Sequence, residues 1–253
     1  MLCKFCNQDR PLVKAHVVPE AFFRDLKTGD MPLFLISSDA RKRPIRSQTG
    51  PYDRGILCRP CENKFEDWDN YAAKLLINDR DTAFERVAVG EFDVFVAKAF
   101  DYEKLKLFLI SVIWRAAVST NPLFDKVRLG PRVNRAMELI AARKPGAASE
   151  FAFVLGRLQS ARPDAPDPKF ATMPFSRTYP GGCHAVKIYL GSFIADVCTG
   201  RQPFPEALGL VAARADEPLQ VVGVRADEVR DFKLFKDSIL THGPRLFSKY
   251  RKE

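Results

Sequence analysis

The sequence contains no apolar run long enough to cross a lipid bilayer. Its most apolar stretch, residues 105–118, is shorter than the roughly 20 residues that a transmembrane helix needs, and it includes Lys106, Ser111 and Arg115. The sequence also lacks a charged N-terminal segment followed by an apolar run, so no secretory signal peptide is predicted. Internal repeats and low-complexity tracts are absent as well. We therefore expect a folded cytoplasmic protein that does not enter a membrane.

Cysteines are few, and their spacing is not that of a disulfide framework. Of the six cysteines, four form the two CxxC pairs Cys3–Cys6 and Cys58–Cys61. A CxxC turn brings two thiolates to one tetrahedral ion, and two such pairs complete a closed site. The sequence therefore predicts a structural zinc site in a reducing compartment. The remaining residues, Cys183 and Cys198, match no metal-binding spacing and are expected to be buried free thiols.

The composition indicates a globular protein with an anionic partner. The chain has 253 residues, of which 46% are apolar, and this is enough for a hydrophobic core in one or two domains. Its formal net charge is +9, with a pI of about 9.3. This balance favours nucleic acid as the first candidate partner.

The N-terminal part is predicted to be a small module that spans residues 1–80. Apolar patterns predict a strand at 12–18, a helix at 19–27, a strand at 33–36 and a helix at 62–77, which would place Cys61 at a helix N-terminus. Residues 37–55 are rich in Ser, Arg, Pro, Gly and Asp and are predicted to be a loop. Its basic cluster is either a solvated loop or an arm that contacts phosphates, and it consists of Arg41, Lys42, Arg43 and Arg46.

The second part, residues 81–253, is predicted to be an α+β domain. A long helix at 101–119, with Asp101 as its N-cap, is apolar nearly all round and should form the core. Trp114 is expected to pack in this core, and Arg115 to pair with a carboxylate or a carbonyl. Further helices are predicted at 130–143 and 226–240, and strands at 92–97, 151–155, 185–196, 208–213 and 219–224.

The N-terminal motifs resemble those of the HNH endonuclease superfamily in its zinc-bearing, treble-clef form. The resemblance covers residues 1–75 and rests on the two CxxC pairs, on residues 15–19 (Ala-His-Val-Val-Pro) and on residues 62–64 (Glu-Asn-Lys). The whole chain also resembles a group of bacterial proteins with the same two-part layout, which implies no mechanism. In the nuclease family, a histidine activates water for attack on a phosphodiester, and a divalent cation stabilises the leaving oxygen.

The resemblance implies a role for each matching residue. His16 matches the general base, Asp53 falls where the family has its middle Asn, and Glu62, followed by Asn63, falls where the last metal ligand lies. Lys64 would contact phosphate. The chain departs from the family at Ala15, where a metal-binding Asp is common, although carboxylates such as Asp53 and Glu62 can still bind Mg²⁺ or Mn²⁺.

Three hypotheses follow from these motifs. The first is a metal-dependent HNH-type endonuclease that acts on nucleic acid, with DNA favoured over RNA, and whose second domain selects substrate or forms an interface with a second copy or a protein partner. The second is a non-catalytic zinc module that binds nucleic acid or protein, which the departure at Ala15 favours. The third is a structural zinc domain beside a separate functional domain. In the latter two, His16 packs at the end of a strand and Glu62 only favours a helix dipole.

Overall fold

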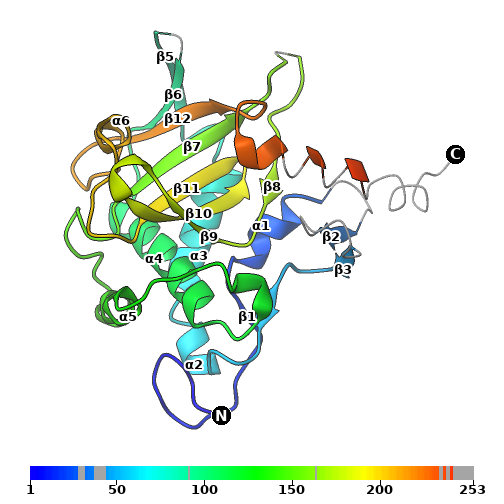
Figure 1. Cartoon of the computed structure of the whole chain (residues 1–253), viewed down its shortest axis with the longest axis vertical. Coiled ribbons are helices and arrows are strands. Elements are labelled where there is room, and N and C mark those ends of the chain that lie inside the picture. The colour runs from blue at the N-terminus through cyan, green and yellow to red at the C-terminus, as the bar shows by residue number, and fades with distance from the viewer. Residues whose placement is uncertain are drawn as a thin grey trace, which may run out of the picture.

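A large mixed β-sheet and a layer of helices on one of its faces make up most of the structure (Figure 1). The computed structural model describes residues 1–27, 32–36, 44–90, 92–162, 164–233, 236–237 and 240–241. The predicted α+β class is confirmed. The predicted basic residues Arg41, Lys42 and Arg43 lie outside the described residues.

Eight strands form the sheet, seven of them in the order β5-β6-β12-β7-β11-β10-β8. The eighth, β9, lies on the same side of β10 as β8, and it pairs with the start of β10, whereas β8 pairs with its end. The pair β12–β7 is parallel, and the other neighbouring strands are antiparallel. The strands are β5 (Glu85–Val89), β6 (Phe92–Ala97), β7 (Phe153–Gln159), β8 (Phe170–Ala171), β9 (Phe175–Thr178), β10 (His184–Gly191), β11 (Phe193–Cys198) and β12 (Leu219–Arg225).

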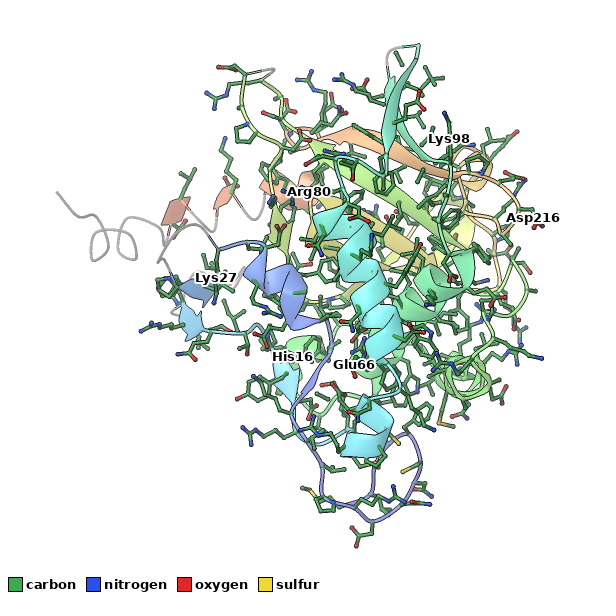
Figure 2. All side chains as sticks on the ribbon, turned by 180° about the vertical axis from the view of Figure 1, so that it is seen from behind. His16, Lys27, Glu66, Arg80, Lys98 and Asp216 are labelled. Atoms are coloured by element: carbon green, nitrogen blue, oxygen red, sulfur yellow. The ribbon has the colours of Figure 1, made fainter. Side chains whose placement is uncertain are left out.

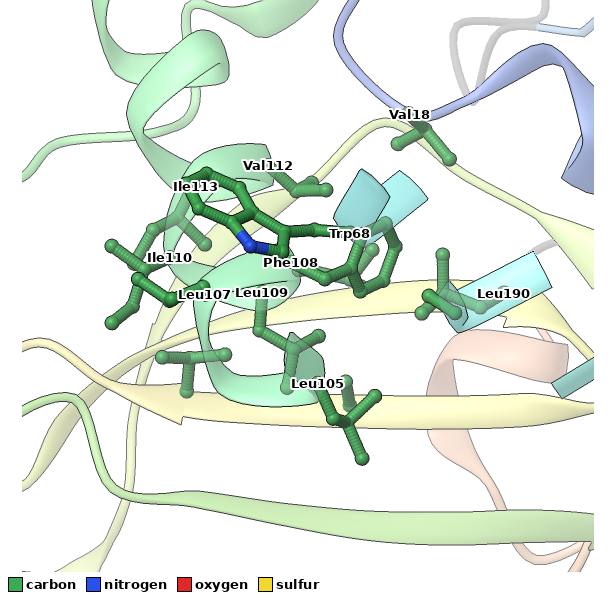
Figure 3. Packing of buried hydrophobic residues seen from close by; sticks show 14 of the residues in the cluster. Val18, Trp68, Leu105, Leu107, Phe108, Leu109, Ile110, Val112, Ile113 and Leu190 are labelled. Carbon is green, nitrogen blue, oxygen red and sulfur yellow. The ribbon is translucent and has the colours of Figure 1, made fainter. Parts of the chain in front are cut away.

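The central helix α4 (Tyr102–Val118) is buried on nearly all sides, as its apolar pattern predicts. The Asp101 side chain caps it by accepting a hydrogen bond of 2.9 Å from the Lys104 backbone N–H. Figure 3 shows its Leu, Ile and Phe side chains packed against their neighbours, among them Trp68. The helices α3 (Glu66–Ala73) and α5 (Arg132–Ala142) flank α4, and β11 lies beneath it. Trp114 is 1% exposed, so its predicted packing role is confirmed.

The N-terminal part is built from short elements that surround the cysteines. They are β1 (Ala15–His16), α1 (Glu20–Arg24), β2 (Leu33–Leu35), β3 (Ile45–Ser47), β4 (Tyr52–Asp53), α2 (Arg59–Glu62) and a π-helical turn (Lys74–Asn78) that continues α3. The strand β1 pairs with β4, and β2 pairs with β3. One cluster of buried side chains runs from this part into the helices and the sheet, so α4 supports both.

Several predicted elements were wrong in the N-terminal part. Residues 37–55 are not a loop throughout, because they contain β3 and β4. Both strands are short and polar, and they form because partners distant in the sequence satisfy their backbone groups, which local propensity cannot reveal. The helix at 62–77 is interrupted between Glu62 and Glu66, where α2 ends and α3 begins in a new direction (Figure 2).

The C-terminal part also corrects the predicted elements. The strand at 185–196 is the hairpin β10–β11, which turns at Gly191 with a φ of 68°. The strand at 208–213 is instead the short helix α6 (Glu206–Leu210), which starts after Pro205, a residue favoured at helix starts. Strand β5 is missing from the prediction because every one of its residues is exposed and no buried face marks it. The 3₁₀ turns Pro122–Phe124 and Pro180–Gly182 complete the elements.

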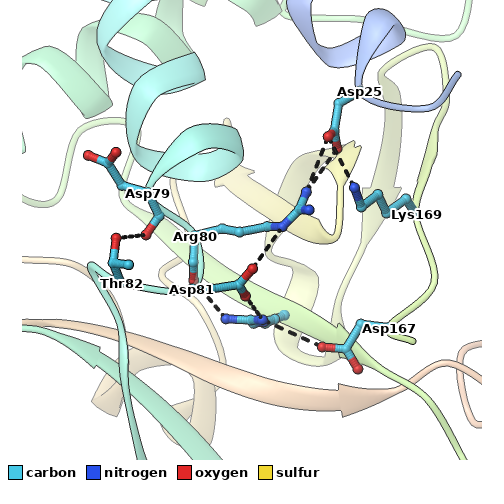
Figure 4. Close-up of polar contacts among 8 residues, drawn as sticks. Asp25, Asp79, Arg80, Asp81, Thr82, Asp167 and Lys169 are labelled. Carbon is cyan, nitrogen blue, oxygen red and sulfur yellow. Dashed lines mark hydrogen bonds and ion pairs between the residues drawn. The ribbon is translucent and has the colours of Figure 1, made fainter. Parts of the chain in front are cut away.

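A network of ion pairs fixes α1 against the sheet (Figure 4). The carboxylate of Asp25, at the end of α1, accepts hydrogen bonds of 3.1–3.2 Å from Arg80 and one of 3.1 Å from Lys169. Arg157, on β7, then donates to the Arg80 carbonyl at 2.8 Å and to Asp81 at 2.7 Å. The side chains of Asp25, Arg80 and Arg157 are 11–22% exposed, whereas that of Asp81 is 67% exposed. The shielded part of the network therefore restricts where α1 and the segment before it can lie.

Candidate functional site

Four cysteines gather at one end of the molecule and form the candidate metal centre. The Sγ atoms of Cys3, Cys6, Cys58 and Cys61 all lie within 4.8 Å of one another. The Sγ atoms of Cys6 and Cys58 are 3.8 Å apart. Zn–S bonds of about 2.3 Å in a tetrahedron also give a sulfur–sulfur spacing of about 3.8 Å. The predicted cluster is confirmed, and it indicates a structural zinc site with no open coordination position.

The backbone around the cysteines is shaped to bind thiolates. Asn7 adopts a left-handed φ of 54°, and its N–H donates to the Cys3 carbonyl at 2.9 Å, which closes the first CxxC turn. The Cys58 N–H points at the Cys3 sulfur at 3.4 Å. Burial raises the pKa of the Cys3 thiol, but backbone N–H groups of Cys6, Cys58 and Phe5 outweigh it and lower the pKa to about 6. These backbone N–H groups therefore stabilise the Cys3 thiolate, whereas burial raises the pKa of the Cys61 thiol.

A polar cavity of about 310 Å³ lies next to the second CxxC pair. It opens between β1, α1, α2 and α3, and His16 and Glu66, which are labelled in Figure 2, both line it. Its walls carry one imidazole, four carboxylates, two amides and two arginines. These side chains are His16, Glu20, Glu62, Glu66, Asp69, Asn63, Asn70, Arg24 and Arg59. The excess of carboxylates over arginines favours a cation in this cavity.

His16 is the only imidazole that lines this cavity. Its Nε2 atom is buried and has no hydrogen-bond partner among the described residues, whereas the Thr49 backbone is a hydrogen-bond partner of the ring. Burial, with the charge of Lys14 acting in the same direction, lowers the pKa of His16 to about 4. At neutral pH the ring is therefore uncharged and has a lone pair available for a proton or a metal ion.

Glu62 brings a carboxylate to the same cavity from the end of α2. Its Oε2 atom is buried and, like the His16 Nε2, lacks a hydrogen-bond partner within the described part of the chain. Burial raises the pKa of Glu62 to about 7, while the nearby Arg115 acts in the opposite direction. A buried carboxylate oxygen without a donor is costly unless a ligand or water satisfies it.

Arg115 connects this cavity to the core helix α4. Its side chain is 0% exposed and forms a two-pronged ion pair with Asp69, at 2.7 and 2.9 Å. The same guanidinium donates to the His16 carbonyl at 2.9 Å and to the Ser111 carbonyl at 3.3 Å. The prediction that Arg115 pairs with a carboxylate or a carbonyl is confirmed. Arg115 therefore fixes the backbone of His16 and one wall of the cavity together.

Asp53 does not line the cavity, although it lies close to His16 in the sheet register. In the pair β1–β4, Asp53 is opposite Ala15 and Tyr52 is opposite His16, so the Asp53 and His16 side chains leave opposite faces. The Asp53 carboxylate accepts bonds of 2.6 Å each from the Ser119 hydroxyl and the backbone N–H groups of Thr120 and Gly55. Its oxygens hold the end of α4 against β4, which leaves them poorly placed for a cation.

The other predicted site residues occupy three kinds of position. Asn63 lines the cavity beside Glu62. Lys64 lies away from it, with its Nζ atom 5.4 Å from the centre of the Phe5 ring. Arg46 is exposed on β3, and the rest of the predicted basic cluster lies outside the described residues.

Sequence reasoning missed most of the acidic wall. Asp69 and Asn70 follow Glu66 at intervals of three and four residues, a spacing that puts these side chains on one face of α3. The same carboxylates also suit a helix N-terminus, which hides a second role. Glu20 directly follows Pro19 at the start of α1, and its place in the cavity depends on how α1 packs.

No family model, curated protein or solved structure matches this chain. Among the described residues, no helix has the length and apolar character needed to span a membrane. In the same described part, the cysteine cluster is the only group of three or more His, Cys, Asp or Glu side chains placed to hold a metal ion. The cavity side chains are therefore not preassembled around a second metal ion.

Proposed function

We propose that this protein is a metal-dependent endonuclease of HNH type, which hydrolyses phosphodiester bonds in nucleic acid, with DNA as the first substrate to test. One observation carries the proposal. The buried, unpartnered atoms His16 Nε2 and Glu62 Oε2 both belong to residues that line the polar cavity next to the cysteine cluster. A base and a carboxylate in one water-accessible cavity are the side chains that metal-assisted hydrolysis requires.

In the proposed mechanism, His16 accepts a proton from the attacking water through Nε2. The ring is neutral at physiological pH because burial holds its pKa near 4. The negative charge of a bound phosphodiester would raise this pKa, since an opposite charge nearby favours the imidazolium form. The hydrogen bond from Arg115 to the His16 carbonyl holds the strand that carries the ring.

Glu62, assisted by Glu66 or Glu20, would hold a divalent cation such as Mg²⁺ or Mn²⁺. The unpartnered Glu62 oxygen fits this donor role. Mg²⁺ commonly binds through one or two carboxylates, several waters and a substrate phosphate, so it does not need a preassembled protein cage. The cation would supply charge stabilisation to the phosphate oxygens. Arg59, also on the cavity wall, is suited to contact the phosphate backbone.

The zinc-bearing segment would act as a structural staple in this proposal. The order of its CxxC turn, the β1–β4 pair and the second CxxC at α2 supports the proposed treble-clef form. A closed site of four thiolates leaves no position for substrate or water. The hydrolytic chemistry is therefore assigned to the neighbouring cavity and not to the zinc ion.

A cleavage assay with matched variants tests the nuclease proposal. Purified protein would be incubated with plasmid, linear DNA and RNA, first with Mg²⁺ and then with Mn²⁺. We expect metal-dependent cleavage that His16→Ala and Glu62→Gln each reduce by at least 100-fold, as is typical for loss of general-base or charge-stabilising groups. Glu217→Gln is the control, because it makes the same chemical change at an exposed residue paired with Arg214. Equal activity of Glu62→Gln and Glu217→Gln would refute the assigned cation site.

Ala15 supports the second candidate, a zinc module that binds nucleic acid without cutting it. Ala15 is fully buried and pairs with Asp53, so an acidic side chain at this position could not reach the cavity. In this case folded, zinc-loaded protein would cleave nothing and would still bind DNA. Charge reversal at Arg41, Lys42 and Arg43 should then weaken DNA binding and its salt dependence, while His16→Ala has no effect.

A further inference from the structure

A second cavity, of about 190 Å³, lies at the edge of the large sheet, outside the site described above. It is formed where β9 pairs with the start of β10, beside the segment that follows β11 (Figure 1). All of its lining residues are polar or basic, and none is acidic. They are Arg128, Ser176, Arg177, Thr178, His184 and Thr199.

Hydrogen bonds hold the cavity walls in fixed positions. The Arg128 backbone N–H donates to the Ser176 hydroxyl oxygen at 3.1 Å, which ties the segment before α5 to β9. The Thr178 hydroxyl and the His184 Nδ1 are 3.0 Å apart. When Thr178 donates in this bond, a neutral His184 ring carries its proton on Nε2 and can donate it to a ligand. The Thr199 N–H donates to the His184 carbonyl at 2.8 Å and closes the third wall.

The charge at this edge is positive and is not neutralised within the cavity. Neither Arg128 nor Arg177 forms an ion pair with a carboxylate in the described part of the chain, and the Arg177 guanidinium instead stacks on the Tyr179 ring, 4.3 Å from its centre. Many of the other surface arginines, such as Arg86 and Arg135, do have carboxylate partners. An arginine that lines a cavity without a partner is available for an external anion.

We propose that this cavity binds a phosphate monoester, carried either by a free nucleotide or by the 5′ end of a nucleic acid strand. The guanidinium fork matches the geometry of phosphate oxygens, and hydroxyl and imidazole donors can complete the contacts. The volume of about 190 Å³ is below the roughly 300–1,000 Å³ of cavities that enclose whole drug-sized ligands. The cavity therefore holds the charged group, while the remainder of the ligand lies outside.

Phosphate titration of the full-length, zinc-loaded protein followed by amide NMR tests this inference. Inorganic phosphate, a nucleoside monophosphate and a short single strand with or without a 5′ phosphate are the probes. We expect saturable shifts at residues 128, 176–178, 184 and 199, and about tenfold weaker binding by Arg128→Gln and by Arg177→Gln, the size of effect that loss of one charge-assisted hydrogen bond produces. Arg214→Gln, which removes the same charge at an exposed position, is the control and should bind as the unmodified protein does.

The comparison of probes identifies the source of the phosphate. If the nucleoside monophosphate binds more tightly than the phosphorylated strand, the natural ligand is a free nucleotide. If the phosphorylated strand binds more tightly, the ligand is the 5′ end of a strand. Absence of saturable shifts at these residues in the unmodified protein would overturn the inference without relying on any variant. Equal phosphate binding by Arg128→Gln, Arg177→Gln and Arg214→Gln would overturn it too. Since the readout is phosphate binding and not cleavage, neither result depends on the proposed nuclease activity.

Discussion

Replacing Arg115 with Met should destabilise the protein strongly, because it would leave a carboxylate without its partner. The Arg115 side chain is 0% exposed and that of Asp69 is 18% exposed. Removal of one partner from a buried ion pair usually costs about 3–5 kcal/mol. Because Asp69 keeps some access to water, we expect the lower end, about 3 kcal/mol, for Arg115→Met. For a chain of this size, each kcal/mol lowers Tm by roughly 2–4 °C, so Tm should fall by about 6–12 °C.

The assay is urea unfolding of the zinc-loaded protein, followed by circular dichroism, for Arg115→Met, Asp69→Leu and the double variant. The two groups contact each other at 2.7 Å, so their effects should not add. The double variant should lose less stability than either single variant alone, since it leaves no uncompensated charge. Arg135→Met, at an exposed arginine paired with Glu150, is the control and should cost below about 1 kcal/mol. Additive effects, or a loss below about 1 kcal/mol for Arg115→Met, would refute the reasoning.

Three further predictions concern the zinc site and two buried ionisable groups. Atomic absorption should find one zinc per chain, and Cys58→Ser should abolish it and lower the unfolding free energy by more than about 4 kcal/mol. Burial lowers the pKa of Lys106 to about 8, so between pH 8 and the usual lysine pKa the unfolded chain binds a proton that the folded chain does not. The free energy of unfolding, measured relative to Lys106→Met, should therefore rise by about 3 kcal/mol as the pH increases through this interval. Burial opposes ionisation of Asp53, but hydrogen bonds from Ser119, Gly55 and Thr120 lower its pKa overall. Asp53→Asn should therefore lower the free energy of unfolding by about 1–3 kcal/mol at pH 7. The denaturation curves of the two proteins should converge as the pH falls below the usual Asp pKa.

The sequence predicts best where a residue's neighbours are close along the chain. The α4 helix and its Asp101 cap follow from local periodicity, and the observed bounds differ from those predicted by only one residue at each end. The cysteine cluster is predicted from two local CxxC turns. The two turns can be expected to meet because one zinc ion requires four ligands. Strand β6 is predicted correctly for a similar reason, because its side chains alternate between a more buried and a more exposed face.

Prediction fails where a side chain's role depends on which face the fold presents. Asp53 satisfies the motif spacing, but the β1–β4 register directs it away from His16 and toward the end of α4. Neither that register nor the position of Ser119 can be read from the sequence around residue 53. For Glu66 and Asp69 the sequence suggests no site role, because carboxylates are common in the first turn of a helix. Their place in the cavity wall becomes evident only when α1 is packed opposite them. The cavity is thus a tertiary feature, whereas the cysteine cluster is a motif.

Two unpartnered atoms of residues that line the cavity indicate what kind of ligand could occupy it. A buried polar atom without a partner costs about 1–3 kcal/mol, so His16 Nε2 and Glu62 Oε2 together favour any ligand that satisfies both. Liquid water occupies about 30 Å³ per molecule, so a cavity of about 310 Å³ has room for several waters in the free protein. An apolar ligand would displace this water and leave both atoms unsatisfied. A hydrated divalent cation would give positive charge to the carboxylate and a water proton to the imidazole, and the proposed phosphodiester hydrolysis would use both contacts.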